Sequence, residues 1–317
     1  MSARRLLLVL LLFPLALSAQ ETVSQQLSES VSVGYVMIPF TVLGDRGVPI
    51  TDLRRGELKL LVDGKPVRSD LFEKSENAPV SFTILLDGSG SMALGGKMDA
   101  ARAAIGALLA HRQPGDDFSL YVFDDAAAHE VVPFTKDVSQ LTRALRTVKP
   151  YGKTAFFDAL STMPERSRLG SNPTRAIILL SDGIDNASKL TRVELAQRLQ
   201  GIAVPIYPLG LREAAELERV DPKHPSESLS DIALLDEIAN LTGGRMQVGN
   251  SPDQISLAIA AMEKNLRAQY LVGFSPSGKG AVKYRRISLD LAGRVRSVRV
   301  RAGYLGTEPP QTERKGS

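Results

Sequence analysis

The chain of 317 residues contains no cysteine and only three histidines, His111, His129 and His224. The absence of cysteine excludes a disulfide framework, a zinc–thiolate site, a cysteine nucleophile and a lipid anchor on an N-terminal cysteine. The few histidines leave little room for a hydrolytic triad or a histidine-ligated metal site. Any metal that the chain binds is therefore expected to be a hard cation held by oxygen atoms.

Neither sign of charge dominates the chain. Lys and Arg number 39 against 35 Asp and Glu, which gives a formal charge of +4, and two of the positive charges are Arg4 and Arg5. So small a surplus, without an aromatic stacking motif, predicts no nucleic-acid partner. Hydrophobic residues at 43% and charged residues at 23% are typical of a folded chain, and the length suits about two domains.

Long hydrophobic runs are also absent, apart from one short run at the start. Two arginines precede apolar residues 6–13, Pro14 interrupts the run, and Ser18 and Ala19 end it. This order of basic, apolar and small residues predicts a secretory signal peptide over 1–19. An uncleaved anchor is the alternative, but the run is short for a bilayer. The mature chain is expected to be secreted or periplasmic.

The remaining sequence divides by the type of pattern that it shows. A central part alternates buried strands with amphipathic helices, whereas the parts on either side show strands and turns without helices. The expected segments are a flexible polar stretch at 20–30, strands at 31–78, an alternating α/β domain at 79–268, strands at 269–305 and a disordered tail at 306–317.

The central part predicts an α/β fold with a doubly wound, mostly parallel, Rossmann-like sheet. Residues 80–86 and 176–180 are nearly continuous apolar runs, as expected for strands that are covered on both faces. Residues 97–112 place their apolar side chains on one helical face. Because the outer strands have no helices to cover them, we expect those at 31–78 and 269–305 to pair in one small flanking β-sandwich.

Carboxylate and hydroxyl side chains follow two of the buried strands. The segment 87–91, with the sequence DGSGS, comes directly after the strand at 80–86, and Asp182 follows the strand at 176–180. Thr154 precedes a predicted helix between them. Because ligands of open α/β sheets bind beyond the carboxyl ends of the strands, we expect these side chains to lie together there.

The candidate metal ligands all carry a side-chain oxygen: Asp87, Ser89, Ser91, Thr154 and Asp182. Gly88 and Gly90 are expected to support them by letting the first loop curl. Such a set suits Mg²⁺, with Mn²⁺ or Ca²⁺ as alternatives. It holds too few carboxylates to close the shell of the metal, so an open position is expected that an Asp or Glu of a partner would fill.

This constellation resembles the metal-ion-dependent adhesion site (MIDAS) of von Willebrand factor type A (VWA) domains. Asp87, Ser89 and Ser91 match its first motif, Thr154 its second, and residues 182–185, Asp-Gly-Ile-Asp, its third. The resemblance implies that the serines and the threonine bind metal directly, and that the aspartates do so directly or through water. It also implies that the strands before positions 87 and 182 lie side by side.

The flanking strands carry a second resemblance. The segments TDLRRGELKLLVDGKPV, QYLVGFSPS and VRVRAGYLG are similar to parts of bacterial secreted VWFA-related proteins known from acidobacterial genomes. Together with the central part, the similarity covers about residues 31–305. It implies an extracytoplasmic protein but does not define a task for it.

Several of these residues also suit purely structural roles. The five candidate ligands fit a set of capped turns without metal. Asp185, a supporting residue of the candidate site, and Asp158 are interpreted as caps or turn acceptors. Asp124 and Asp125 are interpreted as a solvated loop, with an additional calcium site as the alternative. A serine hydrolase is disfavoured because its Gly-x-Ser-x-Gly elbow is absent around both serines.

Basic residues accumulate in the last strands: Lys279, Lys283, Arg285, Arg286, Arg294, Arg296, Arg299 and Arg301. A solvated sheet face is the favoured interpretation, with a bulge near Ser297 reconciling their spacing. Contact with an anionic envelope lipid or polysaccharide is the alternative. A polar insertion at 211–230 has no assigned role.

The favoured function is a non-enzymatic, adhesion-type module that binds a protein or matrix ligand through Mg²⁺. The alternative is an envelope scaffolding or assembly component in which the metal is only structural. A metal-assisted hydrolase is a third class, but no general base is evident in the sequence.

Overall fold

The computed structural model describes residues 35–309, apart from 77, 126, 212–229, 250–251, 278, 292–294 and 296. The expected signal peptide at 1–19, the polar stretch at 20–30 and nearly all of the insertion at 211–230 lie outside the described residues. Within the described part, no helix is both long and apolar enough to cross a membrane.

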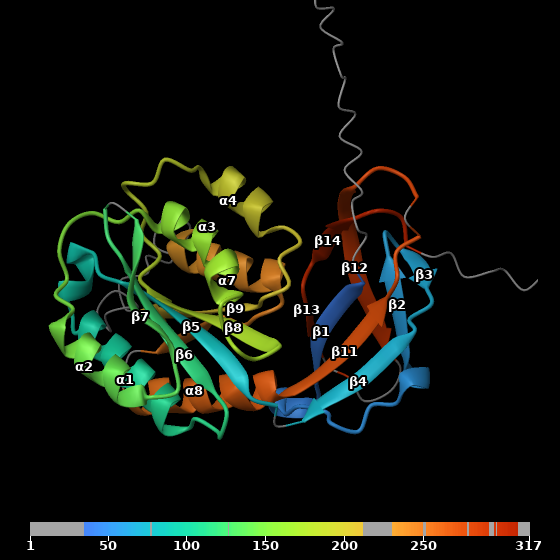
Figure 1. The fold of residues 1–317 in the computed structure, drawn as a ribbon, viewed down its shortest axis with the longest axis horizontal. Coiled ribbons are helices and arrows are strands. Elements are labelled where there is room, and N and C mark those ends of the chain that lie inside the picture. The colour runs from blue at the N-terminus through green and yellow to red at the C-terminus, as the bar shows by residue number, and fades with distance from the viewer. Residues whose placement is uncertain are drawn as a thin grey trace, which may run out of the picture. The chain divides into compact units, whose positions relative to one another are not determined.

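The central sheet has six strands in the order β10-β9-β8-β5-β6-β7 (Figure 1). All neighbouring pairs are parallel except β6 and β7, which are antiparallel. The chain runs outward from β5 through β6 to β7 and then returns to place β8 on the other side of β5. The order therefore reverses between β5 and β8. The strands are β5 (Val80–Asp87), β6 (Asp117–Phe123), β7 (Ala128–Thr135), β8 (Thr174–Ser181), β9 (Ile206–Leu211) and β10 (Gln247–Gly249).

Helices cover both faces of this sheet, as the sequence predicts (Figure 1). One face packs against α1 (Lys97–Ala110), α2 (Val138–Thr147) and α8 (Pro252–Arg267). The other packs against α3 (Phe156–Ser167), α4 (Arg192–Leu199) and α7 (Ser230–Thr242).

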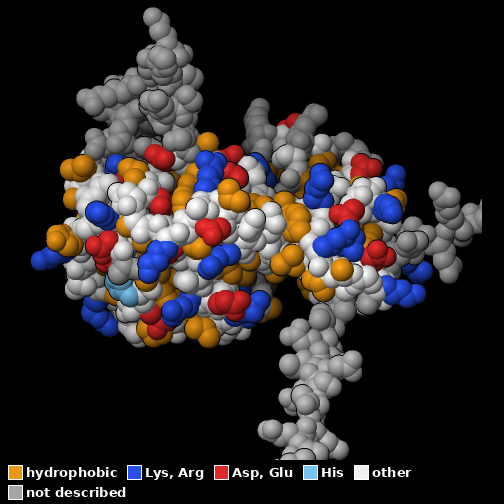
Figure 2. Space-filling view, turned by 90° about the horizontal axis from the view of Figure 1, so that it is seen from above, with side chains coloured by type: hydrophobic (Ala, Val, Ile, Leu, Met, Phe, Trp, Pro, Cys, Tyr) orange, Lys and Arg blue, Asp and Glu red, His pale blue; other side chains and the backbone are white. Residues whose placement is uncertain are grey.

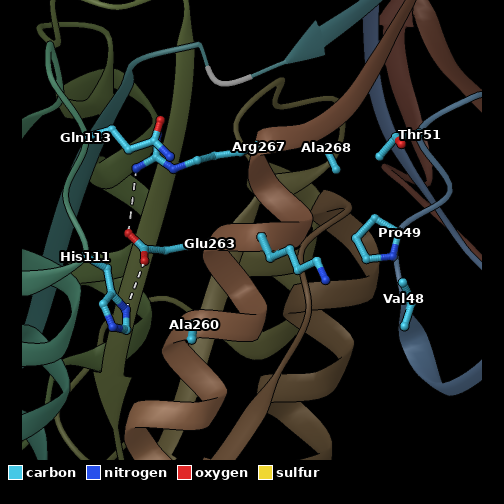
Figure 3. A pocket seen from close by; sticks show the side chains of 10 residues that line it. Val48, Pro49, Thr51, His111, Gln113, Ala260, Glu263, Arg267 and Ala268 are labelled. Carbon is cyan, nitrogen blue, oxygen red and sulfur yellow. Dashed lines mark ion pairs between the residues drawn. The ribbon is translucent and has the colours of Figure 1, made fainter.

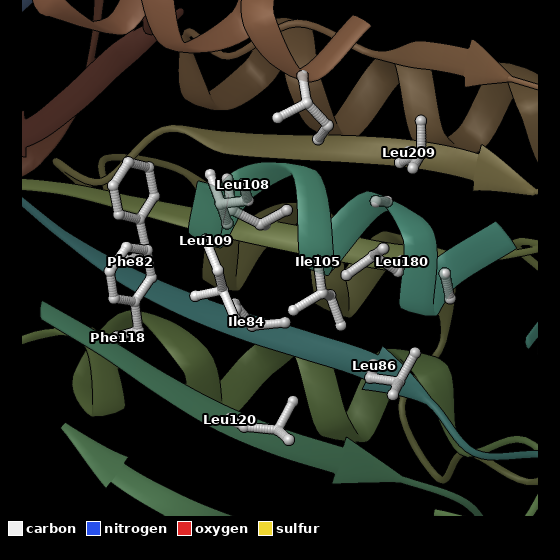
Figure 4. Close-up of a cluster of buried hydrophobic side chains, with 14 of the residues drawn as sticks. Phe82, Ile84, Leu86, Ile105, Leu108, Leu109, Phe118, Leu120, Leu180 and Leu209 are labelled. Carbon is white, nitrogen blue, oxygen red and sulfur yellow. The ribbon is translucent and has the colours of Figure 1, made fainter. Parts of the chain in front are cut away.

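The alternation of side chains along β5 supplies both of these cores. Ile84 and Leu86 belong to the core under α1, whereas Leu85 between them belongs to the core under α3. Figure 4 shows Ile105 of α1 beside Ile84 and Leu180. Every residue of β5 is buried, and apart from Ser81, Thr83 and the terminal Asp87 the strand is apolar, as is typical of a strand covered on both faces.

The remaining strands form two antiparallel sheets, in the orders β13-β1-β11-β4 and β14-β12-β2-β3. They are β1 (Val36–Leu43), β2 (Leu58–Val62), β3 (Lys65–Val67), β4 (Leu71–Glu76), β11 (Ala268–Phe274), β12 (Lys283–Leu291), β13 (Ser297–Val300) and β14 (Gly303–Gly306), with short 3-10 turns at η1 (Asp45–Gly47) and η2 (Arg55–Glu57). Strand β1 pairs with both β11 and β13, and β2 pairs with β12. The predicted sandwich from both ends of the chain is confirmed.

Turn chemistry fixes one hairpin of this sandwich. Asp63 and Gly64 have φ values of 51° and 76° between β2 and β3. These are the left-handed conformations that an Asp-Gly hairpin adopts readily. The same Asp63 accepts hydrogen bonds from Arg285 and from the backbone N–H of Arg286, so the turn is tied to β12.

Two of the basic residues in the last strands correct the solvated-face interpretation. Arg285 is 5% exposed and pairs with Asp63 at 3.1 Å. Arg301 is 6% exposed and donates to the backbone oxygens of Met37 and Gly201 at 3.0 and 3.1 Å. Opposing strands and loops cover these arginines, and nothing in their spacing could indicate that. Arg294 and Arg296 lie outside the described residues.

The start of the expected tail is also corrected. Gly306 ends β14, and Glu308 exchanges backbone hydrogen bonds with Ser277 and Lys279 at 2.8 and 3.1 Å. Residues 306–309 therefore belong to the sandwich, whereas 310–317 lie outside the described residues. On the face seen in Figure 2, acidic and basic side chains are interspersed, in keeping with the small net charge.

Candidate metal centre

Three loops at the carboxyl ends of the strands carry the candidate ligands. One loop follows β5 and continues into the short 3-10 helix η3 (Gly90–Ala93), one precedes α3, and one follows β8. Leu86 of β5 pairs with Leu180 of β8, so Asp87, the last residue of β5, and Asp182, the residue after β8, stand at the ends of neighbouring strands. The adjacency that the resemblance implied is confirmed, and it places the loops where the strand order reverses, which is the usual ligand position of such sheets.

Backbone hydrogen bonds join the loop after β5 to the loop before α3. The N–H of Gly90 donates to the oxygen of Gly152 at 3.0 Å, and the N–H of Tyr151 donates to the oxygen of Gly88 at 2.8 Å. A side chain at Gly90 would obstruct this approach, and one at Gly88 would collide with β6. A Cβ atom at Gly88 would lie 2.7 Å from Cγ1 of Val122, and one at Gly90 would lie 3.1 Å from the oxygen of Gly152.

The loop before α3 is joined in turn to the loop after β8. The N–H of Thr154 donates to Oδ1 of Asn186 at 2.8 Å, and the oxygen of Thr154 accepts the N–H groups of Asn186 and Ala187, both at 3.0 Å. The three loops are therefore one hydrogen-bonded unit. Asn186 was not predicted to contribute, because its role depends on a loop more than thirty residues earlier in the chain.

Asp87 is fully buried and is held by two donors. Its Oδ2 accepts the hydroxyl of Ser181 at 2.7 Å, and its Oδ1 accepts the N–H of Ser89 at 2.9 Å. Burial raises the pKa of Asp87 to about 6, against the effect of the hydrogen bonds from Ser181 and Ser89. The negative charge of Asp182 raises this pKa further.

The two serines of the first loop present a pair of hydroxyl groups. Their Oγ atoms are 3.1 Å apart. Neighbouring ligands of an octahedral Mg²⁺ at 2.0–2.1 Å are separated by about 2.9 Å, so this pair has nearly the spacing of two ligands of one ion. Ser89 and Thr154 are buried, whereas Ser91 is partly exposed, so an outside group would approach from the side of Ser91.

Lys97 lies at the site although the sequence analysis did not select it. Its Nζ is 3.2 Å from Oδ2 of Asp182, and the two side chains are 4% and 0% exposed. The other oxygen of Asp182 accepts the N–H of Ile184 at 3.3 Å. A lysine at the first position of a helix opposes the helix dipole, and that mismatch was the signal available in the sequence.

The two other aspartates have structural contacts. Asp185 accepts the N–H of Phe157 at 3.3 Å, near the start of α3. Asp158 accepts the N–H groups of Lys189 and Leu190, both at 2.9 Å. These contacts are those of a helix cap and a turn acceptor, in agreement with the sequence interpretation of both residues.

The candidate site holds too few carboxylates to bind a hard cation by carboxylates alone, so hydroxyl groups would have to contribute. Among the residues that the structure describes, no group of three or more His, Cys, Asp or Glu side chains could hold a metal ion. The candidate set contains two carboxylates, a pair of serine hydroxyls and a threonine, which is an oxygen-only combination of the kind that Mg²⁺ accepts while keeping waters. The additional calcium site considered at Asp124 and Asp125 gains no support.

A second cluster of charged groups lines a cavity of about 670 Å³ at the end of α8 (Figure 3). Glu263 pairs with Nδ1 of His111 at 3.3 Å and with Arg267 at 3.7 Å, and Arg267 pairs with the buried Asp116 at 2.6 Å. Burial raises the pKa of Glu263 to about 7. Because α8 continues directly into β11, this cluster lies where the α/β domain passes into the sandwich.

Comparison with known proteins agrees with this geometry. Residues 82–184 match the family model of the von Willebrand factor type A domain. No curated protein shows a significant match.

Solved structures give weaker likenesses. A von Willebrand factor type A protein from Catenulispora acidiphila is 14% identical over 87% of this chain and 74% of its own, with a TM-score of 0.46. An aerotolerance-related membrane protein from Bacteroides fragilis is 20% identical over 59% of this chain and 98% of its own, with a TM-score of 0.43. The vWF domain of the type V pili tip protein Mfa5 from Porphyromonas gingivalis is 15% identical over 65% of this chain and 98% of its own, with a TM-score of 0.43.

At these identities and TM-scores the solved structures carry no argument about function. The similarity rests on the matched residues, which include β5 from Phe82 onward, β8 and the loops of the candidate site up to Ile184. Over residues 82–184, about a third of its length, the chain is thus similar to the von Willebrand factor type A domain.

Proposed function

We propose that this chain is a secreted or periplasmic, non-enzymatic binding module whose VWA domain holds Mg²⁺ and captures a protein or matrix ligand through that ion. An Asp or Glu of the ligand completes the metal shell. The observation that carries this proposal is the hydroxyl pair of Ser89 and Ser91, 3.1 Å apart, on loops that also bring two buried carboxylates together. The proposed location rests on the sequence pattern of residues 1–19.

The ligand set leaves a position for an acidic partner. Asp87 and Asp182 are its only carboxylates and the other ligands are uncharged hydroxyls, so the shell of the ion can take a further oxygen. A bound Mg²⁺ would supply an electrophilic position for one further oxygen, reached beside the partly exposed Ser91. Carboxylates that ligate metals are commonly held in place by hydrogen bonds from the protein, and both of these accept such bonds.

The surface beside the site supports docking of another molecule. Tyr151 is 83% exposed and Leu94 is 62% exposed, and they belong to two of the loops that surround the candidate ligands. A cavity of about 250 Å³ lies between Val148, Tyr151 and Gly88, which belongs to the metal loop, the loop after β5 that carries Ser89 and Ser91. Exposed apolar side chains next to a polar centre are a common arrangement of interaction surfaces.

A retention experiment tests the proposal. The purified protein is immobilised and exposed to an envelope extract of the producing cell, in Mg²⁺ and in EDTA. Asp87→Asn, which keeps the shape of the side chain, removes a charge from the site. Asp99→Asn is the matched control, because Asp99 is an exposed carboxylate on α1 that pairs with Arg102 on the same helix.

We expect a ligand that the wild type and Asp99→Asn retain in Mg²⁺, and that EDTA or Asp87→Asn releases. Retention that is unchanged by EDTA and unchanged by Asp87→Asn would contradict the metal-bridged function. If EDTA lowered the melting temperature while retention persisted, the scaffolding alternative with a structural metal would replace it.

A further inference from the structure

The ammonium group of Lys97 competes for space and charge at the candidate metal site. It lies 3.2 Å from Oδ2 of Asp182, while Oδ1 of the same carboxylate accepts the N–H of Ile184 at 3.3 Å. Both oxygens of Asp182 therefore already have protein donors. A divalent cation that takes this carboxylate must share it with Lys97 or displace it.

The local backbone delivers Lys97 to this position. Gly95 and Gly96 precede it with φ values of 57° and 73°, in the left-handed region that favours glycine. Lys97 then opens α1 with its side chain only 4% exposed. A lysine in the first turn is unfavourable to the helix dipole, and the pair with Asp182 offsets part of this cost.

Charge explains what the pair does. Asp87 and Asp182 are buried and repel each other, and one ammonium group offsets part of that repulsion. A divalent cation would offset all of it but would be repelled by the ammonium group at close range, and this repulsion is strong where water is excluded. The ammonium group and the metal would therefore compete for the carboxylate of Asp182.

We propose that Lys97 is a resident competitor of the metal, which stabilises the loops when no cation is bound and lowers the affinity of the site for Mg²⁺. This inference rests on the proposed function and names the residue that sets the strength of its metal binding. When a metal binds, Lys97 must release its contact with Oδ2 of Asp182.

Titration calorimetry with MgCl₂ alone tests this role in the full chain. Lys97→Met removes the charge and keeps a long side chain. Lys153→Met is the matched control, because Lys153 is exposed and adjoins Thr154, so it reports the general effect of a nearby positive charge. We expect Lys97→Met to bind Mg²⁺ about tenfold or more tightly than the wild type, and Lys153→Met to differ by about twofold at most.

Thermal unfolding gives a second readout. In EDTA, Lys97→Met should melt below the wild type because Asp182 loses its partner, and Mg²⁺ should raise its melting temperature by more than that of the wild type. Lys97→Gln keeps a neutral donor for Asp182, so it serves if the methionine variant does not fold. It should change Mg²⁺ affinity in the same direction.

The outcomes separate this inference from the proposed function. Unchanged or weaker Mg²⁺ binding by both Lys97 variants, with binding present in the wild type and absent in Asp87→Asn, overturns the competitor role alone. Binding by Lys97→Met but not by the wild type supports the competitor role and contradicts the proposed function. No binding by any variant overturns both.

Discussion

The hydroxyl of Ser181 donates a hydrogen bond of 2.7 Å to Oδ2 of Asp87, so the last residue of β8 holds the last residue of β5. The same hydroxyl oxygen accepts the N–H of Gly183 at 2.9 Å. Ser181 therefore couples a candidate metal ligand on one strand to the turn that carries the other, Asp182. The site depends on this contact between strands as much as on its own ligands.

Ser181→Ala should destabilise the fold and weaken metal binding. The substitution leaves the buried Asp87 oxygen and the Gly183 N–H without this partner, which should cost about 1–3 kcal/mol of unfolding free energy. Urea denaturation measures the loss, and titration with MgCl₂ measures the binding. Ser161→Ala is the control, because that hydroxyl donates to a carbonyl within its own helix. Equal stability of the two variants would contradict this role of Ser181.

Gly88→Ala should disturb the metal loop without a change in charge. Its Cβ would lie 2.7 Å from Val122 Cγ1 and 3.2 Å from the oxygen of Phe123, so the loop must shift. We expect weaker Mg²⁺ binding by titration calorimetry. Gly106→Ala in α1 meets no atom within 4 Å and should instead stabilise the protein, by about 0.5–1 kcal/mol. Wild-type Mg²⁺ affinity in Gly88→Ala would show that the close approach is not needed.

Arg267→Met should be among the more destabilising substitutions outside the candidate metal site. Arg267 pairs with Asp116 at 2.6 Å, and both side chains are nearly or fully buried. Loss of one partner leaves a buried charge and should cost about 3–5 kcal/mol by denaturant unfolding. Arg168→Met breaks an exposed pair with Glu165 and should cost less than about 1 kcal/mol. Similar costs for the two variants would contradict this difference.

The raised pKa of Glu263 predicts a specific pH dependence of stability. Burial raises this pKa from 4.5 to about 7, with Arg267 opposing and Asp116 adding to the rise. Because the folded protein holds the proton more tightly than the unfolded chain, this group's stabilisation is complete below pH 4.5. It is lost as the pH rises through 7, by at most about 1.4 kcal/mol per pH unit.

Glu263→Gln should remove this pH dependence, because glutamine mimics the neutral acid. The variant should gain stability relative to the wild type as the pH rises from about 5 to about 8, measured by denaturation at each pH. His111 contacts Glu263 at 3.3 Å, so the comparison is repeated in a His111→Gln background. A constant difference between variant and wild type across this range would contradict the raised pKa.

The sequence predicted the α/β domain well because its strands are buried on both faces. The apolar run at 80–86 and the carboxylate that follows it correspond to β5 and Asp87. Pairing of the two end segments was also predictable, since neither had a helix to cover it. The neighbouring position of β5 and β8 came from the resemblance to VWA domains, because hydrophobic periodicity contains no information on strand order.

Contacts between distant positions could not be predicted. Lys97 and Asp182 are 85 residues apart, and no local pattern joins them. Arg285 and Arg301 have the alternating surroundings of a solvated strand, but Asp63 and backbone oxygens of other elements bury them. Ser181 and Asn186 are ordinary turn residues in the sequence, and only the assembled loops give them a role.

Crystals grown with Mn²⁺ test the central claim most directly, because manganese gives an anomalous signal and accepts the oxygen ligands that suit Mg²⁺. We predict one strong anomalous peak among the side-chain oxygens of the candidate ligands: Asp87, Ser89, Ser91, Thr154 and Asp182. At saturating Mn²⁺, a map with no peak there, or with its strongest peak elsewhere on the chain, would contradict the account.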